Sequence, residues 1–406
     1  MFKSINDIET LLKKHDAYRN GCLNLVASEN SASSVVRRLA DNDFVNRYGC
    51  YETLKPEIRE YPGNKFINEF EIATHELVKD IFEAEYVDLR PIGGHMAGMA
   101  VVLGLMEPGE KVIEVSLENW GHGLVGPMCK IKHLQQTIDV HYMPFNDDRC
   151  VDTEKLREQI ITLKPRMVIF GGSGTILPEP VKEFRSLADK MGFIIAYDAS
   201  HVTGLIAGKV FPNPIKEGAD LMFGSTHKSF PGPQGGFVVS NNRDLIEKIG
   251  NTLSPSLVTS HHLYRLPPLA AAVLEMKQFG NEYARQVVKN SQVLANALAS
   301  CGFMIAGKNF GYSHTHLLLM DLTNNKIESP SILLEKAGIL CNYDFSGKRS
   351  ELRIGTAEAT RRGFRENEME KIAIYFKRVL LDMEDPDKIA KEVFEFVNQY
   401  NKTEYC

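Results

Sequence analysis

The sequence lacks any hydrophobic run long enough to cross a membrane, although the chain has 406 residues. A transmembrane helix needs about 18 consecutive apolar residues. The first residues, MFKSINDIETLLKKHD, mix charged and apolar side chains. This pattern predicts an amphipathic first helix and not the apolar segment of a secretion signal. We therefore expect no membrane association and a cytoplasmic protein.

The seven cysteines form no Cys-x-x-Cys pair, and the sequence contains no His-Glu-x-x-His. An odd number of scattered cysteines does not fit a disulfide framework, and it is compatible with a reducing compartment. Zinc sites usually show close pairs of cysteine or histidine. No metal centre is expected.

Basic residues are also not in excess. The formal net charge is −5, and lysine and arginine form no dominant stripe, which argues against nucleic acids or anionic membranes as partners. Apolar residues make up 43% and charged residues 24% of the chain, as in ordinary soluble proteins. The length predicts two to three domains. We expect a protein that binds a small molecule.

The middle of the chain alternates short apolar runs with amphipathic segments. Strands are predicted at 110–116, 165–172, 191–198, 219–226 and 235–240, with helices at 151–163 and 180–191 between them. Such alternation predicts an α/β fold with a mostly parallel sheet covered on both faces. Sites in such sheets lie where strands end.

The pattern changes after about residue 265. Two long helices are predicted at 266–279 and 283–302, followed by strands at 316–322 and 351–356 and helices at 329–338 and 366–383. This is typical of a smaller second α/β domain. We predict an N-terminal arm over 1–50, a large domain over 51–270 and a small domain over 271–406.

Two residues at predicted strand ends suggest the chemistry. Lys228 lies in GSTHKSFPGPQGG, just after one strand, and Asp198 lies at the end of another, in AYDASH. A Schiff base with a cofactor aldehyde needs a partly desolvated lysine, whose amine then loses its proton readily. Pyridoxal phosphate also needs a carboxylate against its ring nitrogen. Lys228 and Asp198 are candidates for these two roles.

The remaining parts of such a site also have candidates. PIGGHMAGMAVVLGLM places Gly93, Gly94 and His95 at a turn that enters a helix, where backbone N–H groups bind phosphate. Arg353 suits an amino-acid carboxylate, because a guanidinium binds it through two hydrogen bonds. Trp120, the single tryptophan, offers a flat face to a cofactor ring. Each signal alone is weak, since such residues more often serve turns, caps or surface ion pairs.

Four runs of sequence resemble one family. YDASHVTGLIAGKVFPNP and ADLMFGSTHKSFPGPQGG are similar to the core of serine hydroxymethyltransferases, which are fold-type I pyridoxal-phosphate enzymes. LNLVASEN at 23–30 and LRIGTAEATRRGF at 352–364 resemble two further motifs of that family. The resemblance extends in order from about residue 21 to the last helix.

The resemblance implies a role for each matching residue. Lys228 would bind the cofactor covalently, Asp198 would hold its ring nitrogen, and His201 and Ser173 would lie near its phenolic oxygen. Arg353, with Ser28, Tyr48 and Tyr61, would bind the amino-acid substrate. Thr226 and His227 would belong to the cofactor site. The family also implies a homodimer or homotetramer whose active sites are shared between subunits.

The chain departs from the family pattern at the edge of the site. The stacking histidine of the family aligns with Asn119 or Trp120, and the phosphate turn Ser-Gly-Ser becomes Gly93-Gly94-His95. An insertion, GCYETLKPEIRE, separates Tyr48 from YPG at 61–63 and puts Glu60 one position out of register. The family's Tyr-Tyr-Gly-Gly run is missing, and the loop with its folate-contacting asparagine is shortened to CNYDFSGKRSE. Pyridoxal phosphate is therefore the predicted cofactor, whereas tetrahydrofolate is left open.

The predicted reaction cleaves the Cα–Cβ bond of a β-hydroxy amino acid, with interconversion of serine and glycine as the first expectation. Glu29, Glu60 and His122 are the candidates for proton transfer. The alternative is a folate-independent aldolase or transaldolase, or a transaminase or racemase on the same scaffold. A non-catalytic protein that binds the cofactor is a third interpretation.

Overall fold

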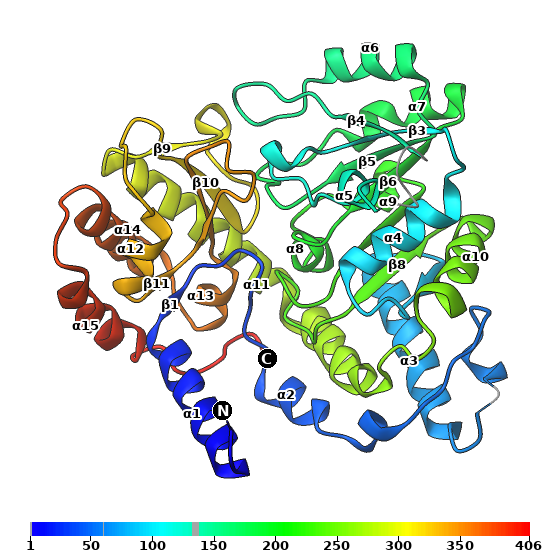
Figure 1. Cartoon of the computed structure of the whole chain (residues 1–406), viewed down its shortest axis with the longest axis horizontal. Helices are drawn as coiled ribbons and strands as arrows, with labels where there is room; N and C mark the ends of the chain where they lie inside the picture. Colours follow the sequence, from blue (N-terminus) through cyan, green and yellow to red (C-terminus); the bar gives the residue numbers. More distant parts are fainter. Residues whose placement is uncertain (1, 60, 132–137) are drawn as a thin grey trace.

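The computed structural model describes residues 2–59, 61–131 and 138–406. Two lobes lie side by side in Figure 1, and the first helix projects from the body. The larger lobe is built on a seven-stranded sheet with the order β2-β8-β7-β6-β5-β3-β4 in the described part of the chain. Its strands are β2 (Tyr86–Asp88), β3 (Lys111–Glu114), β4 (Asp139–Tyr142), β5 (Met167–Gly171), β6 (Ile194–Asp198), β7 (Leu221–Ser225) and β8 (Gly236–Ser240).

The central strands are parallel, as the alternating pattern predicted. β4, β3, β5, β6 and β7 run in parallel, β8 pairs antiparallel with β7, and β2 pairs antiparallel with β8. All residues of β5, β6, β7 and β8 are buried, which explains their continuous apolar runs. The predicted fold class is confirmed. Sequence reasoning missed β2 and β4, because both are short and β4 has a partly exposed, polar sequence.

Helices cover both faces of this sheet (Figure 1). Two of the expected helices are found as α6 and α7, within a residue or two of their predicted limits. The helices of this lobe are α3 (Lys65–Phe82), α4 (Gly94–Leu105), α5 (Val125–Met128), α6 (Thr153–Leu163), α7 (Val181–Met191), α8 (Thr203–Ala207), α9 (Pro214–Glu217) and α10 (Arg243–Asn251).

The smaller lobe has its own antiparallel sheet with the order β12-β13-β10-β9. The strands predicted at 316–322 and 351–356 are β10 (Leu317–Asp321) and β13 (Glu351–Gly355), which pair directly. The other elements are β9 (Met304–Ile305), β11 (Ile339–Leu340), β12 (Asn342–Tyr343), α12 (Pro330–Lys336), α13 (Ala357–Arg361), α14 (Glu366–Leu380) and α15 (Pro386–Val397).

The N-terminal arm packs on both lobes, because Leu23 and Leu25 lie in the core of the smaller lobe and Val36 lies in that of the larger one. It consists of α1 (Ile5–Gly21), β1 (Leu23–Asn24) and α2 (Ser34–Ala40). β1 pairs in parallel with β11, more than 300 residues later in the chain. The arm therefore brings the run after β1, which includes Ser28 and Asn30, to the seam between the lobes.

A single helix replaces the two that were predicted after residue 265. α11 (Leu266–Ser300) is continuous over 35 residues, so the expected break near residue 280 is wrong. Gly280 serves packing here: a Cβ on Gly208 would lie 2.4 Å from the Gly280 carbonyl oxygen. The first part of α11 packs into the core of the large lobe and its last part into that of the small lobe. The domain limits at 50 and 270 remain a prediction.

A helix able to cross a bilayer would have to be both long and strongly apolar. Among the helices in the described ranges, none combines the required length with sufficient apolar character.

Candidate active site

Lys228 and Asp198 follow neighbouring strands of the large sheet. Lys228 is half-buried and comes three residues after β7, whereas Asp198 is buried at the end of β6. Burial lowers the pKa of Lys228 to about 8, against the opposing charge of Asp198 and with a smaller effect of Arg353. An amine with this pKa is deprotonated far more often than an exposed lysine near neutral pH.

Asp198 is held as a carboxylate. Burial alone would raise its pKa, but His122, Lys228 and the contact with Ser200 outweigh that effect and lower the pKa to about 2. His122 Nδ1 lies 2.7 Å from Asp198 Oδ2, and the Ser200 N–H donates to Oδ1 across 2.9 Å. The second ring nitrogen of His122 lies 3.2 Å from His95 Nδ1. The negatively charged Asp198 carboxylate is thus available for the protonated ring nitrogen of pyridoxal phosphate.

His201 is buried close to Lys228 and Arg353. The burial of its ring and the positive charges of Lys228 and Arg353 hold its pKa well below the usual range. His201 Nδ1 lies 3.4 Å from His316 Nε2, and the two rings are stacked with centroids 5.5 Å apart. His316 was not predicted from the sequence.

Arg353 enters from β13 of the small lobe. Its Nη1 donates to the Ser173 carbonyl and its Nη2 to Asn342 Oδ1, both across 2.9 Å, while its Nε is buried without a hydrogen-bond partner. Burial lowers its pKa to about 10, so it stays charged at neutral pH. Ser173 meets Arg353 through its backbone carbonyl in this arrangement, and no contact of its hydroxyl was found among the described residues.

Trp120 lies behind Arg353. The indole is 2% exposed, its Nε1 donates to Glu351 across 2.9 Å, and its ring centroid lies 5.0 Å from the Arg353 guanidinium carbon. Phe345 packs against the same guanidinium at 5.1 Å. This arrangement does not favour the predicted stacking of Trp120 on the cofactor, because the buried indole already contacts Glu351 and the guanidinium of Arg353. His122, two residues later, is the aromatic residue that contacts Asp198.

The predicted phosphate turn forms the first turn of α4. A Cβ on Gly94 would lie 2.3 Å from Ser225 Oγ and 2.8 Å from Ser200 Oγ, so only glycine allows this close approach. Ser200 Oγ is buried without a partner, and so is Nδ1 of His227, next to Lys228. Free N–H groups at a helix N-terminus together with an unpartnered buried hydroxyl fit a phosphate group. These residues therefore fit pyridoxal phosphate.

The backbone of Lys228 is held by two residues that sequence reasoning did not assign. Asn30 Nδ2 donates to the Lys228 carbonyl across 2.7 Å, and the Tyr283 hydroxyl donates to the Ser229 carbonyl across 2.9 Å. Asn30 Nδ2 also lies 2.9 Å from Tyr283 Oη. Asn30 was visible as the last residue of the ASEN run, whereas Tyr283 carried no sequence signal.

Other predicted residues lie elsewhere. Glu29 forms an ion pair with Arg19 and accepts a hydrogen bond from Asn24, so its carboxylate is engaged on the side of α1. Thr226 donates through its hydroxyl to the Pro233 carbonyl and closes the loop after Lys228. Glu60 lies outside the described residues.

The predicted substrate-binding residues Ser28, Tyr48 and Tyr61 lie in two places. Ser28 follows Ala27, and the backbone of Ala27 packs closely on Gly355. A Cβ on Gly355 would lie 2.5 Å from the Cα atom of Ala27. Ser28 is thus brought to the strand that carries Arg353. Tyr48 and Tyr61 form a tilted ring pair with centroids 4.9 Å apart, and both are more than 40% exposed.

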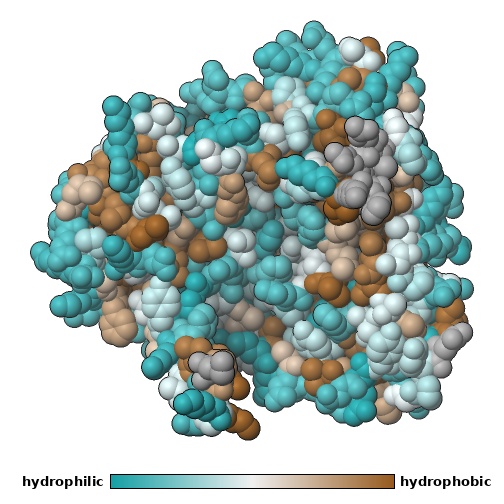
Figure 2. All heavy atoms as spheres, in the orientation of Figure 1, coloured by the Kyte–Doolittle hydropathy of each residue, from teal (hydrophilic) through white to brown (hydrophobic). Residues whose placement is uncertain are grey.

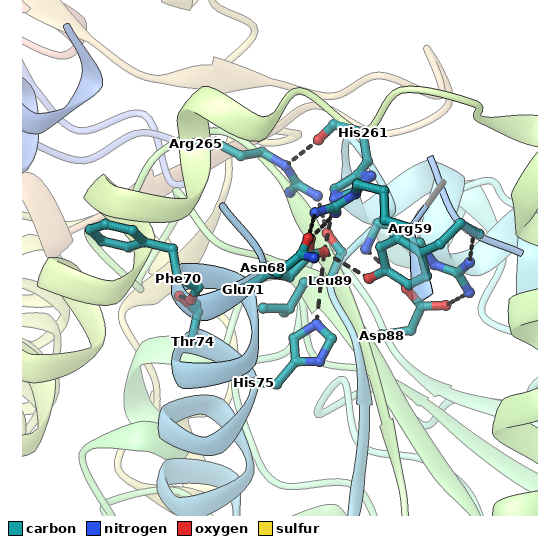
Figure 3. Close-up of polar contacts among 12 residues, drawn as sticks. Arg59, Asn68, Phe70, Glu71, Thr74, His75, Asp88, Leu89, His261 and Arg265 are labelled. Atoms are coloured by element: carbon teal, nitrogen blue, oxygen red, sulfur yellow. Dashed lines mark hydrogen bonds and ion pairs between the residues drawn. The ribbon is translucent and has the colours of Figure 1, made fainter. Parts of the chain in front are cut away.

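The insertion between Tyr48 and Tyr61 is anchored to α3 through a buried carboxylate. Figure 3 shows Arg59, His261 and His75 turned toward Glu71. Tyr51 of the insertion donates to Glu71 across 2.7 Å. Its ring lies between two guanidinium carbons, 5.0 Å from that of Arg59 and 4.9 Å from that of Arg90.

Charge keeps Glu71 ionised. Its burial would raise its pKa, but His261, His75 and Arg59 hold the pKa well below the usual range. Arg90 pairs with Asp88 across 2.7 Å and also donates to the Tyr51 carbonyl across 2.8 Å. Tyr51 and Arg59 thus connect the insertion to buried groups of the large lobe.

A cleft of about 540 Å³ lies between the segment that follows β3 and the shortened loop. Its lining residues are Glu114, Ser116, Leu117, Glu118, Asn119, Gly123, Gly126, Pro127, Lys130, Tyr142, Met143, Phe345, Ser346 and Lys348. Figure 2 shows largely hydrophilic side chains along the hollow between the lobes. Its lining includes the charged residues Lys130, Glu114 and Glu118, and Lys348 forms an ion pair with Glu118.

A family model described as serine hydroxymethyltransferase matches residues 2–376, most of the chain. The chain belongs to the serine hydroxymethyltransferase family. Serine hydroxymethyltransferases from Pyrococcus abyssi and Methanobrevibacter smithii are each 38% identical to it. The alignments cover 97% of this chain and 95% of the relative in the first case, and 98% and 95% in the second.

A solved structure agrees with this membership. The L-threonine transaldolase from Pseudomonas fluorescens superposes with a TM-score of 0.90 at 29% identity, over 98% of this chain and 91% of that chain. The chain is a fold-type I, pyridoxal-phosphate-dependent enzyme that acts on β-hydroxy amino acids, as the sequence predicted.

Proposed function

We propose that this enzyme interconverts serine and glycine, with tetrahydrofolate as the acceptor of the one-carbon unit. The observation that carries the proposal is the convergence of Lys228, Asp198 and Arg353 at the seam between the lobes. The charges of Asp198 and Arg353 both act on the pKa of Lys228. A lysine, a carboxylate and a guanidinium in one place are what an amino-acid substrate and pyridoxal phosphate require.

Each of these side chains has one task. Pyridoxal phosphate, when bound, supplies an electron sink for the electron pair left on Cα. The Lys228 amine would hold the cofactor through its aldehyde, which the lowered pKa of Lys228 favours. The Asp198 carboxylate would accept a hydrogen bond from the ring nitrogen of the cofactor, and the buried Arg353 would bind the substrate carboxylate, with Ser28 nearby. The first turn of α4, with Ser200, binds the phosphate.

The reaction moves two protons, and three predicted residues are candidates for these transfers. The β-hydroxyl loses its proton, the Cα–Cβ bond breaks, Cβ leaves as an aldehyde and Cα takes up a proton. His122 is the candidate that contacts Asp198, whereas Glu29 is paired with Arg19. We therefore favour His122 over Glu29 as the proton-transfer residue that this chain supplies.

A second candidate function is a folate-independent aldolase or transaldolase. The anchored insertion at 49–59 favours it, because Tyr51 and Arg59 replace a segment that the resemblance assigns to catalysis with folate. The similarity to an L-threonine transaldolase supports the same alternative. In both cases we propose that the acceptor binds in the cleft lined by Glu114, Glu118 and Lys348.

The acceptor can be tested with four assays of the purified enzyme. Glycine formation is measured from serine and from threonine, each with and without tetrahydrofolate. The first proposal predicts serine cleavage that depends on tetrahydrofolate. Cleavage of threonine that is independent of tetrahydrofolate, with no reaction of serine, would reject it in favour of the aldolase.

A variant of Lys228 separates both enzymes from a non-catalytic protein. Lys228→Ala should abolish the visible absorbance of the lysine-bound cofactor and all cleavage, whereas Lys248→Ala, at an exposed position of α10, should change neither. An unchanged absorbance in Lys228→Ala would rule out both enzymatic proposals. Aminotransfer or racemisation without Cα–Cβ cleavage would point to the other reactions of this scaffold.

We also propose a homodimer or homotetramer with shared active sites. α1 buries none of its residues in the single chain, and Ile5, Leu11 and Leu12 are each more than half exposed. Apolar side chains are visible at the free end of this helix (Figure 2). The exposed pair of Tyr48 and Tyr61 would then serve the neighbouring subunit. Light scattering of the purified protein measures the number of subunits.

A cytoplasmic location is part of the same proposal. All seven cysteines carry free thiols, from the buried Cys22 to the exposed Cys406. Free thiols are compatible with a reducing compartment. Fractionation of the producing cells tests this assignment.

A further inference from the structure

His316 connects three parts of the chain at the active site. It precedes β10 of the small lobe and is fully buried. Its Nε2 lies 3.0 Å from the carbonyl oxygen of Ala27, in the N-terminal arm, and 3.4 Å from Nδ1 of His201, in the large lobe. Both of these polar contacts of the imidazole are made by the same nitrogen atom.

The contact with Ala27 determines where the proton of His316 resides. A backbone carbonyl can only accept a hydrogen bond, so Nε2 of His316 must carry the proton. Burial lowers the pKa of His316 to about 3, with further effects of Arg353 and Lys228, so the ring is neutral. Its Nδ1 is therefore a bare nitrogen, and Nδ1 is indeed buried without a hydrogen-bond partner.

The proton of His316 in turn restricts His201. Two N–H groups cannot face each other at hydrogen-bond distance, so Nδ1 of His201 must accept and share the proton of His316 Nε2. The ring of His201 is neutral as well, because its pKa is held well below the usual range by burial and by Lys228 and Arg353. The single proton of the His201 ring is then on Nε2.

We infer that His316 is a positioning residue that fixes His201 as the Nε2–H tautomer, so that His201 presents a hydrogen-bond donor and not an acceptor to the active site. The inference rests on the proposed function and deepens it, because an N–H donor is the group that an anionic ring oxygen of the cofactor requires. Without His316, both tautomers of His201 would be populated, and the Nδ1–H form would turn a lone pair toward that oxygen.

A purely packing role would not explain the choice of histidine. A buried imidazole with a bare nitrogen is less favourable than an apolar side chain of similar size, because the polar atom loses water without gaining a partner. What an apolar side chain could not supply is the N–H that both Ala27 and His201 share. Ala27 also precedes Ser28, so the same proton connects the arm to the cofactor side of the site.

Nuclear magnetic resonance of the imidazole nitrogens tests this inference directly. The full-length protein, purified with its cofactor, is labelled with ¹⁵N-histidine, and the signals of His201 are identified by their loss in His201→Gln. The wild type should show His201 protonated at Nε2. His316→Gln, whose amide N–H can take the place of Nε2–H, should keep this state. His316→Phe should shift about half or more of His201 to the Nδ1–H form and lower kcat at least about twofold, in proportion to the Nε2–H form that is lost, at unchanged KM.

A matched control lies two residues away. His314 is exposed and also contacts a backbone carbonyl, that of Phe310 at 3.1 Å, so His314→Phe should leave the His201 signals and kcat unchanged. A wild-type His201 protonated at Nδ1 would overturn the inference, and this result needs no variant to fold. An unchanged His201 signal in folded His316→Phe would overturn it too. The nitrogen signals report on the tautomer whichever acceptor the enzyme uses, so failure of the folate proposal is seen separately.

Discussion

Asn30 donates a hydrogen bond to the carbonyl oxygen of Lys228 across 2.7 Å, although 198 positions of sequence separate the two residues. The bond connects the N-terminal arm to the loop that carries the catalytic lysine proposed here. Tyr283 of α11 completes the arrangement by donating to the next carbonyl, that of Ser229. The position of the Lys228 backbone is therefore set by the arm and by α11 together.

Loss of this bond should reduce activity. Asn30→Ala leaves a partly buried carbonyl without its donor, which costs about 1–3 kcal/mol, and it releases the Lys228 backbone. We expect kcat to fall about tenfold, equivalent to about 1.4 kcal/mol. Steady-state kinetics measure this change. Asn20→Ala, at the exposed end of α1, is the control, and equal kinetics of the two variants would contradict the role of Asn30.

Cofactor uptake should depend on pH through Lys228. Only the neutral amine attacks an aldehyde, and the pKa of Lys228 is lowered to about 8. The neutral fraction, and with it the rate of uptake by cofactor-free protein, should fall about tenfold for each pH unit below 8 and level off above it. Stopped-flow absorbance from about pH 6 to about pH 9.5 measures this profile.

The same profile in Asp198→Asn provides a second comparison. Asp198 acts against the lowering of the Lys228 pKa, since its negative charge stabilises the protonated amine. Its removal should move the midpoint to a pH below that of the wild type. A midpoint that stays in place or rises would show that Asp198 does not act on Lys228.

Arg353→Lys should weaken substrate binding and leave the cofactor in place. Lysine keeps the charge but cannot present two parallel N–H groups to a carboxylate. A loss of about 2–3 kcal/mol predicts that KM for the amino acid rises about 30- to 150-fold. The visible absorbance of the bound cofactor should not change. A normal KM in this variant would exclude Arg353 as the carboxylate site.

Replacement of Glu71 should destabilise the large lobe. Glu71→Gln leaves the buried guanidinium of Arg59 without its counter-ion, and breaking a buried pair in this way costs about 3–5 kcal/mol. Urea unfolding measures the loss. Asp43→Asn, which breaks the exposed pair of Asp43 and Arg47, should have a much smaller effect. Similar losses in both variants would contradict the anchoring role of Glu71.

The sequence was sufficient for the sheet and for the main residues of the site because their signals are local. The strand that ends at Asp198 and the strand before Lys228 are continuous apolar runs, and the parallel fold then brings their ends to one edge. Gly94 was visible as a glycine before an apolar helix. Its close contact with Ser200 and Ser225, which explains the glycine, was not.

The remaining features depend on contacts between distant segments. Trp120 was predicted to face the cofactor, but the cation of Arg353 and the carboxylate of Glu351 offer the indole a buried place that no local pattern reveals. His316 and Tyr283 lie in ordinary strand and helix contexts. The break predicted near Gly280 failed because tertiary packing against Gly208 outweighs the low helix propensity of glycine.

The continuity of α11 limits how this chain can change in length. Each residue added to an α-helix advances the later part of the chain by about 1.5 Å and turns it by about 100°. A single insertion between Val287, in the large-lobe core, and Leu294, in the small-lobe core, would turn the small lobe and carry Arg353 away from Lys228. Functional variants of this enzyme should therefore accept additions in exposed loops and keep this stretch of α11 at constant length.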